Sequence, residues 1–584
     1  MSQGYFAFVL HSHLPYVLSH GRWPHGTDWL TEAAAETYLP IIRIMNELVG
    51  EGGHPKLTIG LSPVLCEQLA DNSFKDEFVY YLNHKIKAAE YDSEEFYRFG
   101  DNTMLATSQY WETFYRDTLE HFAGIGQDIL FEFRKLQDAG YLEIITCGAT
   151  HGYYPLLARD ESLQVQTKMA VRNYQRHFGR DPKGIWLPEC AYRPRYDWQR
   201  PLGSGVATEP YPRKGADEFL TENGLDFFII DSALLKGGKS VGVYIDRFDA
   251  LKTLWGQFES QYQPRSEAVD RTPREIYLVN SAPEGKKPTA VFTRDPETGL
   301  LVWSGEHGYP GDGAYLDFHK KRHPGGHRYW SVTSAEADLA DKKPYYREKA
   351  LQRIPENADH FAGKVTEILT DYTDSGGEDG ILVAPYDAEL FGHWWFEGPQ
   401  FLKRVLRHID HSADVESTFL HEHLARRKPT SVVSIPEGSW GQGNHHYIWL
   451  NKHTEWTWKH IYEAEDTMCE LARRWASGTE RQDAELEAVL KQAARELMLL
   501  SSSDWQFLIS TWSARDYGEL RISEHFNDFT RLAAMAEKKL AGSPLDTGDT
   551  EFFKECSARD CLFDDIDLEW FATVEYPAAP LVRS

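Results

Sequence analysis

Short apolar runs alternate with longer helical patterns over the first three quarters of the chain. The runs are β-branched or aromatic and end in polar residues, which is typical of buried parallel strands; they cover residues 5–10, 57–61, 142–147, 184–187, 226–230 and 381–385. Apolar residues at helical spacing lie between them, as in residues 32–51 and 161–177. This alternation predicts an α/β fold, either a wound parallel sheet or a (β/α) barrel.

Three regions lack this alternation of strands and helices, and they set the expected domain boundaries. Residues 75–138, rich in Tyr, Phe, Glu and Lys, predict a helical insertion, whereas residues 236–290, polar and punctuated by Gly and Pro, predict a long loop or lid. After residue 411 the strand pattern gives way to helical periodicity. We therefore expect a barrel domain over residues 1–411 and a C-terminal helical domain with an acidic tail over residues 412–584.

Charge and composition argue against several kinds of partner. The 584 residues hold 62 Lys and Arg against 89 Asp and Glu, and the net charge of −27 is the wrong sign for nucleic acid or an anionic membrane surface. No apolar stretch reaches the roughly 20 residues of a membrane-spanning helix, and the N-terminus lacks the basic region and cleavage site of a signal peptide. The six cysteines have no disulfide or zinc spacing, so reduced thiols in the cytoplasm are the simplest interpretation.

Aromatic residues are more numerous than a core needs. The chain has 18 Trp and 30 Tyr, many of them beside Gly, Pro and His in loop-like surroundings. Flat rings at a surface stack on the C–H faces of sugars, because the weakly positive hydrogens meet the negative π face. A neutral polysaccharide is also indifferent to the charge of the protein, so the composition favours an extended glycan as ligand.

Residues that can carry chemistry follow several of the predicted strands. Catalytic groups of a barrel gather where its strands end. His11 and His13 lie at the end of the first strand, His151 follows the third, Glu189 follows the fourth and Asp387 follows the last. A closed barrel brings the two acids face to face, although they are far apart in the chain.

Two facing carboxyl groups are what glycoside cleavage requires. One must hold a proton for the departing oxygen, while the other stays ionised to attack the anomeric carbon or to activate water. Each acid alone is more often a salt-bridged or capping group, so the hypothesis rests on the whole set. Taken singly, His11 and His13 are typical of core-edge histidines, and Trp186, Trp394 and Trp395 are typical of core residues.

Two other classes of protein fit part of this set. An H-x-H at the end of a first barrel strand, with a later histidine and a late Asp, also describes metal-dependent amidohydrolases, in which zinc activates water. That class predicts stoichiometric metal and sensitivity to chelators, whereas the two-carboxylate hypothesis predicts neither a metal nor a cofactor. A carbohydrate-binding module without catalysis fits the aromatic residues but not the acids at the strand ends.

Five motifs resemble, in order and approximate spacing, the signature regions of glycoside hydrolase family 57. They are HSHLPY at 11–16, CGATHGYYPLL at 147–157, WLPECAYRP at 186–194, APYDAELFGHWWFEGP at 384–399 and SWGQGNHHYIWLN at 439–451. With VWSGEHGYPGD at 302–312, WTWKHIYEAE at 456–465 and SSDWQFLISTW at 502–512, they are similar to the 1,4-α-glucan branching enzymes of that family. The resemblance extends from the first strand to about residue 535.

The resemblance implies a distorted (β/α)7 barrel with a helical insertion, a C-terminal helical domain beside the cleft, and a retaining double displacement without a metal. It implies Glu189 as the nucleophile, Asp387 as the general acid/base and Tyr244 as a tyrosine on a mobile loop. The positions that match the lining of the glucan site are His11, His13, His151, Trp23, Trp29, Trp186, Trp303, Trp395, Trp440, Trp449 and Asp504.

The resemblance also implies a substrate and a reaction. An α-1,4-glucan such as amylose, glycogen or amylopectin is cleaved, and the piece is rejoined through an α-1,6 linkage, as in glycogen biosynthesis. An α-amylase or a 4-α-glucanotransferase of the same family remains an alternative. Retention requires about 5 to 5.5 Å between the carboxyl groups of Glu189 and Asp387, whereas more than about 6.5 Å indicates inversion.

Overall fold

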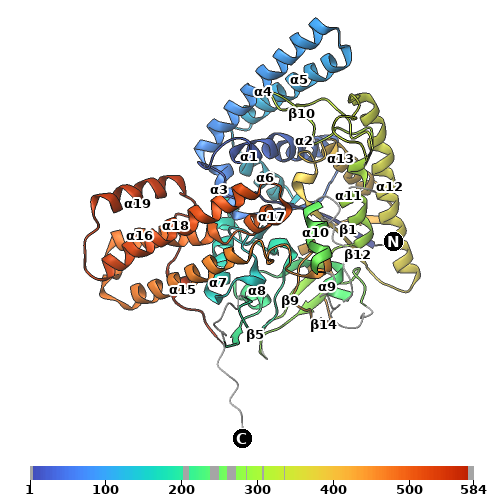
Figure 1. The fold of residues 1–584 in the computed structure, drawn as a ribbon. Helices are drawn as coiled ribbons and strands as arrows, with labels where there is room; N and C mark the ends of the chain where they lie inside the picture. The colour runs from blue at the N-terminus through green and yellow to red at the C-terminus, as the bar shows by residue number, and fades with distance from the viewer. Residues whose placement is uncertain are drawn as a thin grey trace.

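The core of the molecule is a curled sheet of parallel strands (Figure 1). The computed structural model describes residues 4–201, 209–236, 249–258, 271–283, 286–304, 308–334 and 336–576. Within these ranges seven parallel strands follow one another in the order β12, β1, β2, β3, β4, β7, β9. Their bounds are β1 Gly4–Ser12, β2 Leu57–Leu61, β3 Leu142–Cys147, β4 Gly184–Trp186, β7 Phe227–Ile230, β9 Thr289–Thr293 and β12 Ile381–Asp387.

The two ends of this series approach each other and close the barrel imperfectly. Arg294, directly after β9, forms a parallel bridge with Val383 of β12, and the amide of Asp295 donates a 2.9 Å hydrogen bond to the Val383 carbonyl. The expected distorted (β/α)7 barrel is therefore confirmed. All six predicted strands are present, and β9 is the strand that the sequence pattern did not reveal.

Shorter strands extend the sheet or form separate hairpins. β8 (Tyr277–Val279) runs antiparallel to β9, β14 (Val432–Val433) pairs with β8, and β13 (Val415–Ser417) pairs with β1. The hairpins are β5 (Tyr196–Trp198) with β6 (Tyr211–Arg213), and β10 (Lys321–Arg322) with β11 (His327–Arg328).

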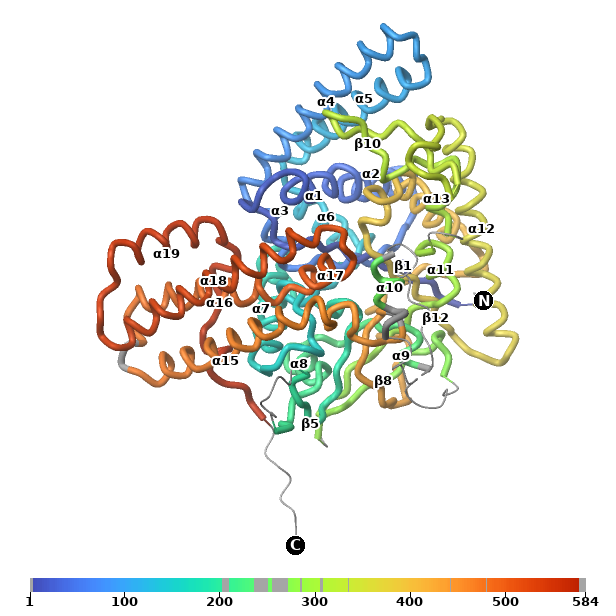
Figure 2. Tube along the Cα trace, in the orientation of Figure 1, coloured from blue at the N-terminus to red at the C-terminus, as the bar shows by residue number. Residues whose placement is uncertain are grey.

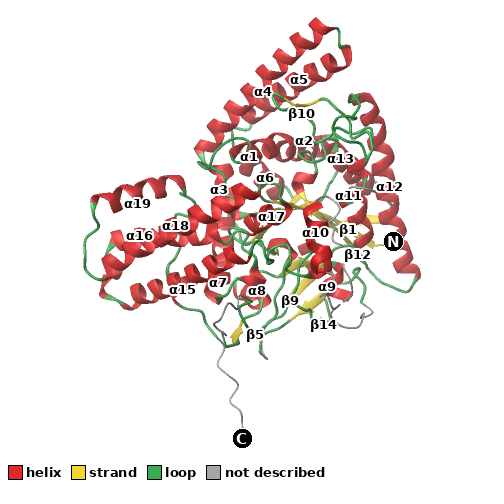
Figure 3. Ribbon diagram, viewed as in Figure 1, coloured by secondary structure: helices red, strands yellow, loops and turns green. Residues whose placement is uncertain are grey.

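Helices surround the sheet (Figure 3), and strands such as β1 are therefore buried along their whole length. A π-helical turn at Ala34–Tyr38 joins the first two helices. The helices of the barrel are α1 Thr27–Ala33, α2 Leu39–Gly50, α3 Pro63–Ala70, α7 Asp160–Phe178, α8 Ala216–Glu222, α9 Ser232–Lys236, α11 Pro296–Trp303, α12 Arg347–Asp374, α13 Gly398–Asp410 and α14 Leu420–Arg426. No helix in the described part of the chain is both long and apolar enough to cross a membrane.

The two expected insertions differ in character. Residues 75–138 fall in α4 (Asn72–Phe99), α5 (Asn102–Gly124) and α6 (Ile129–Asp138), and the α4–α5 pair projects from the barrel (Figure 2). The segment 236–290 contains α10 (Asp249–Phe258) and β8. Residues 237–248, 259–270 and 284–285 of this segment lie outside the described residues.

A second body of helices lies against one side of the barrel, at the left in Figure 1. Its helices are α15 Glu455–Ser477, α16 Ala484–Leu500, α17 Ser503–Thr511, α18 Arg515–Leu540, α19 Thr547–Arg559 and α20 Glu569–Ala572. β13 and β14 lie beyond residue 411, yet they hydrogen-bond to strands of the main sheet. We therefore propose that the barrel domain extends to Thr454 and that the helical domain begins with α15.

Two glycine substitutions should change stability in opposite directions. Gly392 has φ of +125°, and a Cβ there would lie 1.7 Å from the Glu36 carbonyl oxygen, so Gly392→Ala should lower the free energy of unfolding by about 2 kcal/mol or more. Gly363 lies exposed within α12 with nothing within 4 Å of such a Cβ, so Gly363→Ala should raise it by up to about 1 kcal/mol. Urea denaturation measures both changes, and a neutral Gly392→Ala would contradict the constraint on this turn.

Candidate active site

The sheet places the candidate groups at the carboxyl ends of neighbouring strands. His11 of β1 lies opposite Asp387, the last residue of β12, in the parallel pairing of these strands. Glu189 follows β4 in a short turn, where its φ of 59° is a left-handed value uncommon outside glycine. His13 and His151 follow β1 and β3. The barrel thus directs groups from four strands toward one region.

Glu189 is buried and held by donors from two distant parts of the chain. Only 9% of the residue is exposed. Trp440 Nε1 donates a 2.7 Å hydrogen bond to Oε2, and Ser503 Oγ donates a 3.1 Å hydrogen bond to Oε1. Burial, with the charges of Asp387 and Asp504, raises the pKa of Glu189 to about 8, while the two hydrogen bonds oppose that shift. The influence of Asp387 on this pKa places the two predicted catalytic acids in one electrostatic environment.

Three imidazole rings form a stack beside Glu189. The rings of His13 and His151 lie 3.8 Å apart and nearly parallel, and Nε2 of His151 is 3.2 Å from Nε2 of His11. Nδ1 of His151 is 2.8 Å from Ser503 Oγ, which links the stack to Glu189. Burial, and then the neighbouring imidazoles, lowers the pKa of His11 and His151 well below the usual value. Both rings are therefore neutral at pH 7 and suited to hydrogen bonds with uncharged hydroxyl groups.

Asp504 reaches this stack from α17 in the helical domain. Its Oδ2 lies 2.9 Å from Nε2 of His13, whose Nδ1 is 2.9 Å from Ser62 Oγ. Burial disfavours the carboxylate, but the charge and hydrogen bond of His13 outweigh burial and lower the pKa of Asp504 to about 2. A permanent negative charge from the second domain thus faces the site.

Two subsets of these residues have the donor types of a metal site. The candidate ligand atoms of His13, His151 and Asp504 all lie within 4.8 Å of one another, as do those of His11, Cys147 and His151. However, both nitrogens of His13 and both of His151 have hydrogen-bonding partners in the protein. The two rings are also parallel, whereas tetrahedral zinc needs nitrogens that converge on one point. The parallel rings argue against zinc at the His13–His151–Asp504 set as it is arranged.

Indole rings form the wall behind the carboxylate. Trp186 stacks on His11 with 4.9 Å between ring centroids, and it meets Trp440 edge-on at 5.5 Å. Trp303 contacts Trp440 at 5.9 Å. These three tryptophans are almost fully buried, so they shape the site and keep water from Glu189.

The remaining predicted aromatic positions lie around this wall. Tyr153, which follows β3, stacks on Trp449 at 4.3 Å. Trp29 is half-buried and packs edge-on against Tyr517 of the helical domain, whereas Trp23 is 69% exposed.

Two predicted residues are not placed at the site by the structure. Trp395 is 1% exposed and its ring neighbours are Tyr315, Phe391 and Phe401, so its contact with substrate stays a prediction. Tyr244 lies outside the described residues.

Sequence analysis missed two polar residues that organise the site. Ser503 joins His151 to Glu189, and its position directly before Asp504 was the only available signal. Glu389 is buried, accepts a 2.6 Å hydrogen bond from the Tyr38 hydroxyl and a 3.2 Å hydrogen bond from the His13 amide, and its pKa is raised by burial to about 8. Its place two positions along from Asp387 in the same motif was the corresponding signal.

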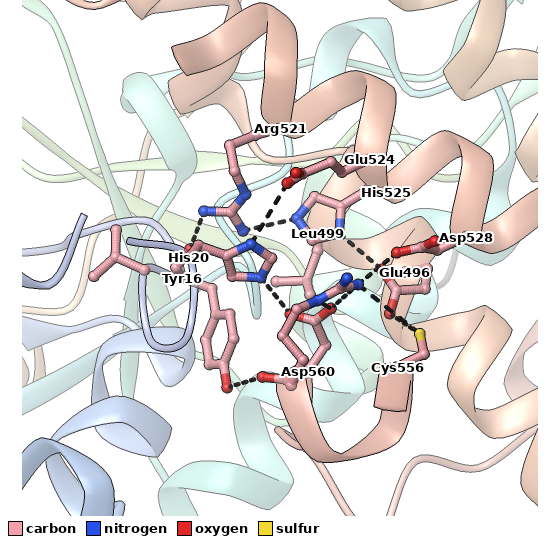
Figure 4. Close-up of polar contacts among 12 residues, drawn as sticks. Tyr16, His20, Glu496, Leu499, Arg521, Glu524, His525, Asp528, Cys556 and Asp560 are labelled. Carbon is pink, nitrogen blue, oxygen red and sulfur yellow. Dashed lines mark hydrogen bonds and ion pairs between the residues drawn. The ribbon is translucent and has the colours of Figure 1, made fainter. Parts of the chain in front are cut away.

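A buried polar network fastens the helical domain to the segment that follows β1 (Figure 4). Arg521 NH1 donates a 2.7 Å hydrogen bond to the Tyr16 carbonyl, and His20 Nε2 lies 2.7 Å from Asp560 Oδ1. His525 joins Arg521 to Glu496, at 2.8 Å and 2.7 Å. The segment that carries His11 and His13 is thus fixed from both domains.

Comparison with known proteins places the chain in a family. Residues 7–436 match the sequence profile of glycosyl hydrolase family 57, and residues 460–571 match the profile described as 1,4-alpha-glucan branching enzyme, C-terminal. The chain belongs to glycosyl hydrolase family 57.

Several relatives are similar over almost the whole chain. The 1,4-alpha-glucan branching enzyme of Thermococcus kodakarensis is 41% identical over 535 residues, which are 91% of this chain and 73% of that protein. The crystal structure of a GH57-type branching enzyme from Pyrococcus horikoshii is 40% identical with a TM-score of 0.86, covering 99% of this chain and 98% of that one. The alpha-amylase AmyC of Thermotoga maritima is 26% identical with a TM-score of 0.78, covering 99% and 100%.

The surroundings of Glu189 predict opposite pH effects for two substitutions. The acid pair loses its last proton as pH rises through the raised pKa of about 8, so kcat/KM for glycoside cleavage should fall there. Asp504→Asn removes a charge that raises this pKa and should move the basic limb to lower pH. Trp440→Phe removes a hydrogen bond to the carboxylate and should move that limb to higher pH. pH–rate profiles of the two variants test this, and shifts in the same direction would contradict the assignment.

Proposed function

We propose that the chain is a 1,4-α-glucan branching enzyme, which cleaves α-1,4 linkages and forms α-1,6 linkages by retaining transglycosylation. The observation that carries this proposal is the buried Glu189 carboxylate, which accepts hydrogen bonds from Trp440 and Ser503 and lies, like Asp387, at the carboxyl end of a barrel strand. It lies in a chain that is 40% identical to a solved GH57-type branching enzyme over nearly its full length.

The reaction divides between the two acids. Glu189 attacks the anomeric carbon while Asp387 protonates the departing glucan oxygen, and Asp387 then removes a proton from the incoming hydroxyl group. The reaction needs one proton shared between the two acids. The hydrogen bonds from Trp440 and Ser503 favour the ionised form of Glu189, which supports assigning that proton to Asp387 once substrate is bound.

The product depends on which nucleophile meets the glycosyl-enzyme. Water gives hydrolysis, a 4-hydroxyl group gives disproportionation, and a 6-hydroxyl group gives a branch. Positioning can supply effective concentrations of about 10⁵ M or more, so a held acceptor can outcompete water where the site is dry. The 9% exposure of Glu189 and the indole wall beside it support such a site.

Two observations favour branching over the amylase and 4-α-glucanotransferase alternatives. The helical domain matches a branching-enzyme profile over residues 460–571 and contributes Ser503 and Asp504 to the site. The identity to the solved branching enzyme is 40%, against 26% to the solved amylase.

We further propose a cytoplasmic location and neutral α-glucan as the partner. The six free cysteines support a reducing compartment. The net charge of −27 argues against nucleic acid as a ligand.

Incubation with amylose tests the proposed reaction. Enzymatic debranching should release chains from the product, whereas few new reducing ends should appear, because most glycosyl groups are transferred. New reducing ends without α-1,6 linkages would identify an amylase instead. Glu189→Gln is the matched control and should lower both products by at least about 10³-fold, since it removes the nucleophile.

The Tyr244 assignment predicts a change in product ratio. The resemblance implies a loop tyrosine at Tyr244, so Tyr244→Ala should raise hydrolysis relative to transfer in the same assay. An unchanged ratio would remove Tyr244 from the site.

Dialysis of the native enzyme against a chelator should leave the ratio and the rate as they were.

A further inference from the structure

Two exposed tryptophans lie on loops that leave the same end of the barrel as the catalytic acids. Trp23 follows β1 and is 69% exposed, and Trp394 follows β12, the strand that ends with Asp387, and is 39% exposed. β1 and β12 are paired neighbours in the sheet. The loops that carry the two indoles thus leave neighbouring strands.

The β10–β11 hairpin and the residues before it touch both indoles. Phe318 stacks on Trp394 with 4.2 Å between centroids and 29° between planes. His323 meets Trp23 edge-on at 5.9 Å. We call Trp23, His323, Phe318 and Trp394 the aromatic strip.

Polar contacts, one of them buried, hold the strip in place. Glu32 of α1 lies 3.1 Å from His393 Nε2 and 3.1 Å from Lys321 Nζ, so it joins the β12 loop to the hairpin. Arg328 NH1 donates a 3.0 Å hydrogen bond to the His393 carbonyl. The rings are thus held in position before a ligand arrives, which lowers the entropic cost of binding.

The backbone of the strip is hydrogen-bonded to Glu389, two residues after Asp387. The amide of Trp394 donates a 3.0 Å hydrogen bond to the Glu389 carbonyl, and the Glu389 side chain accepts from the His13 amide. Exposed histidine and lysine side chains at His319, His323 and Lys321 lie beside the rings and offer partners for hydroxyl groups. Flat apolar faces bordered by polar groups suit a sugar chain.

We propose that the Phe318–Trp394 stack forms an accessory subsite that holds a segment of α-1,4-glucan outside the catalytic cleft. This inference rests on the proposed function. The subsite adds affinity for long chains and leaves the chemistry at Glu189 and Asp387 unchanged.

Binding is tested in inactive protein so that the ligand stays intact. Glu189→Gln should bind linear amylose in calorimetry, and addition of Trp394→Ala should weaken binding about fivefold, the loss expected for one aromatic stacking contact. Trp394→Phe keeps a flat ring and should retain most of the affinity. Phe131→Ala is the matched control, because Phe131 is 51% exposed on α6 and lies outside the strip.

Kinetics separate this role from a merely structural one. In the active enzyme Trp394→Ala should raise KM for amylose about fivefold with kcat changed less than about twofold. Equal affinity for amylose with and without Trp394→Ala, while the native enzyme still branches amylose, overturns the subsite alone. Absence of all glucan binding and activity overturns the proposed function as well.

Sedimentation distinguishes another occupant of the strip. A native dimer that Trp394→Ala converts to a monomer would show that a second copy of the chain covers the strip, and this would also overturn the proposal.

Discussion

The site depends on keeping one carboxylate out of water while two fixed donors point at it. Trp440 comes from a loop beyond the last barrel strand, and Ser503 comes from the first turn of α17. Burial makes the carboxylate costly to ionise, whereas the donors stabilise its charge. The balance of these opposing terms leaves Glu189 able to exchange its proton near neutral pH, and neither domain supplies both donors alone.

The neutral rings of His11 and His151 complement this balance. The stacked rings of His11, His13 and His151 are close enough that several positive charges would repel one another, and burial makes such charges costlier still. Asp504 supplies the one compensating charge, next to His13. The stack can therefore offer hydrogen bonds to hydroxyl groups without a large electrostatic penalty.

The sequence pattern predicted the barrel strands because their burial on both faces produces unbroken apolar runs. β9 was not predicted from the sequence because Thr289–Thr293 is short and adjoins a polar region. The acids and histidines were predictable because each lies where a strand ends. Trp394 and Trp395 are adjacent on one loop, yet Trp394 is 39% exposed and Trp395 is 1% exposed, a difference that the tertiary packing around Phe391 determines and that no local pattern encodes. Ser503 and Glu389 act through tertiary contacts across hundreds of residues, which no local pattern encodes.

The network around His20 and Asp560 has a consequence for how the protein is made. Tyr16 and His20, in the loop after β1, are bound by Arg521 and Asp560, which are translated last. Ser503 also belongs to this late-translated part of the chain. Domains tend to fold in order of synthesis, so the barrel emerges from the ribosome before these anchors exist. A nascent chain therefore lacks a complete candidate site until the helical domain docks, so the contacts of Ser503 and Asp504 form only when translation is nearly complete.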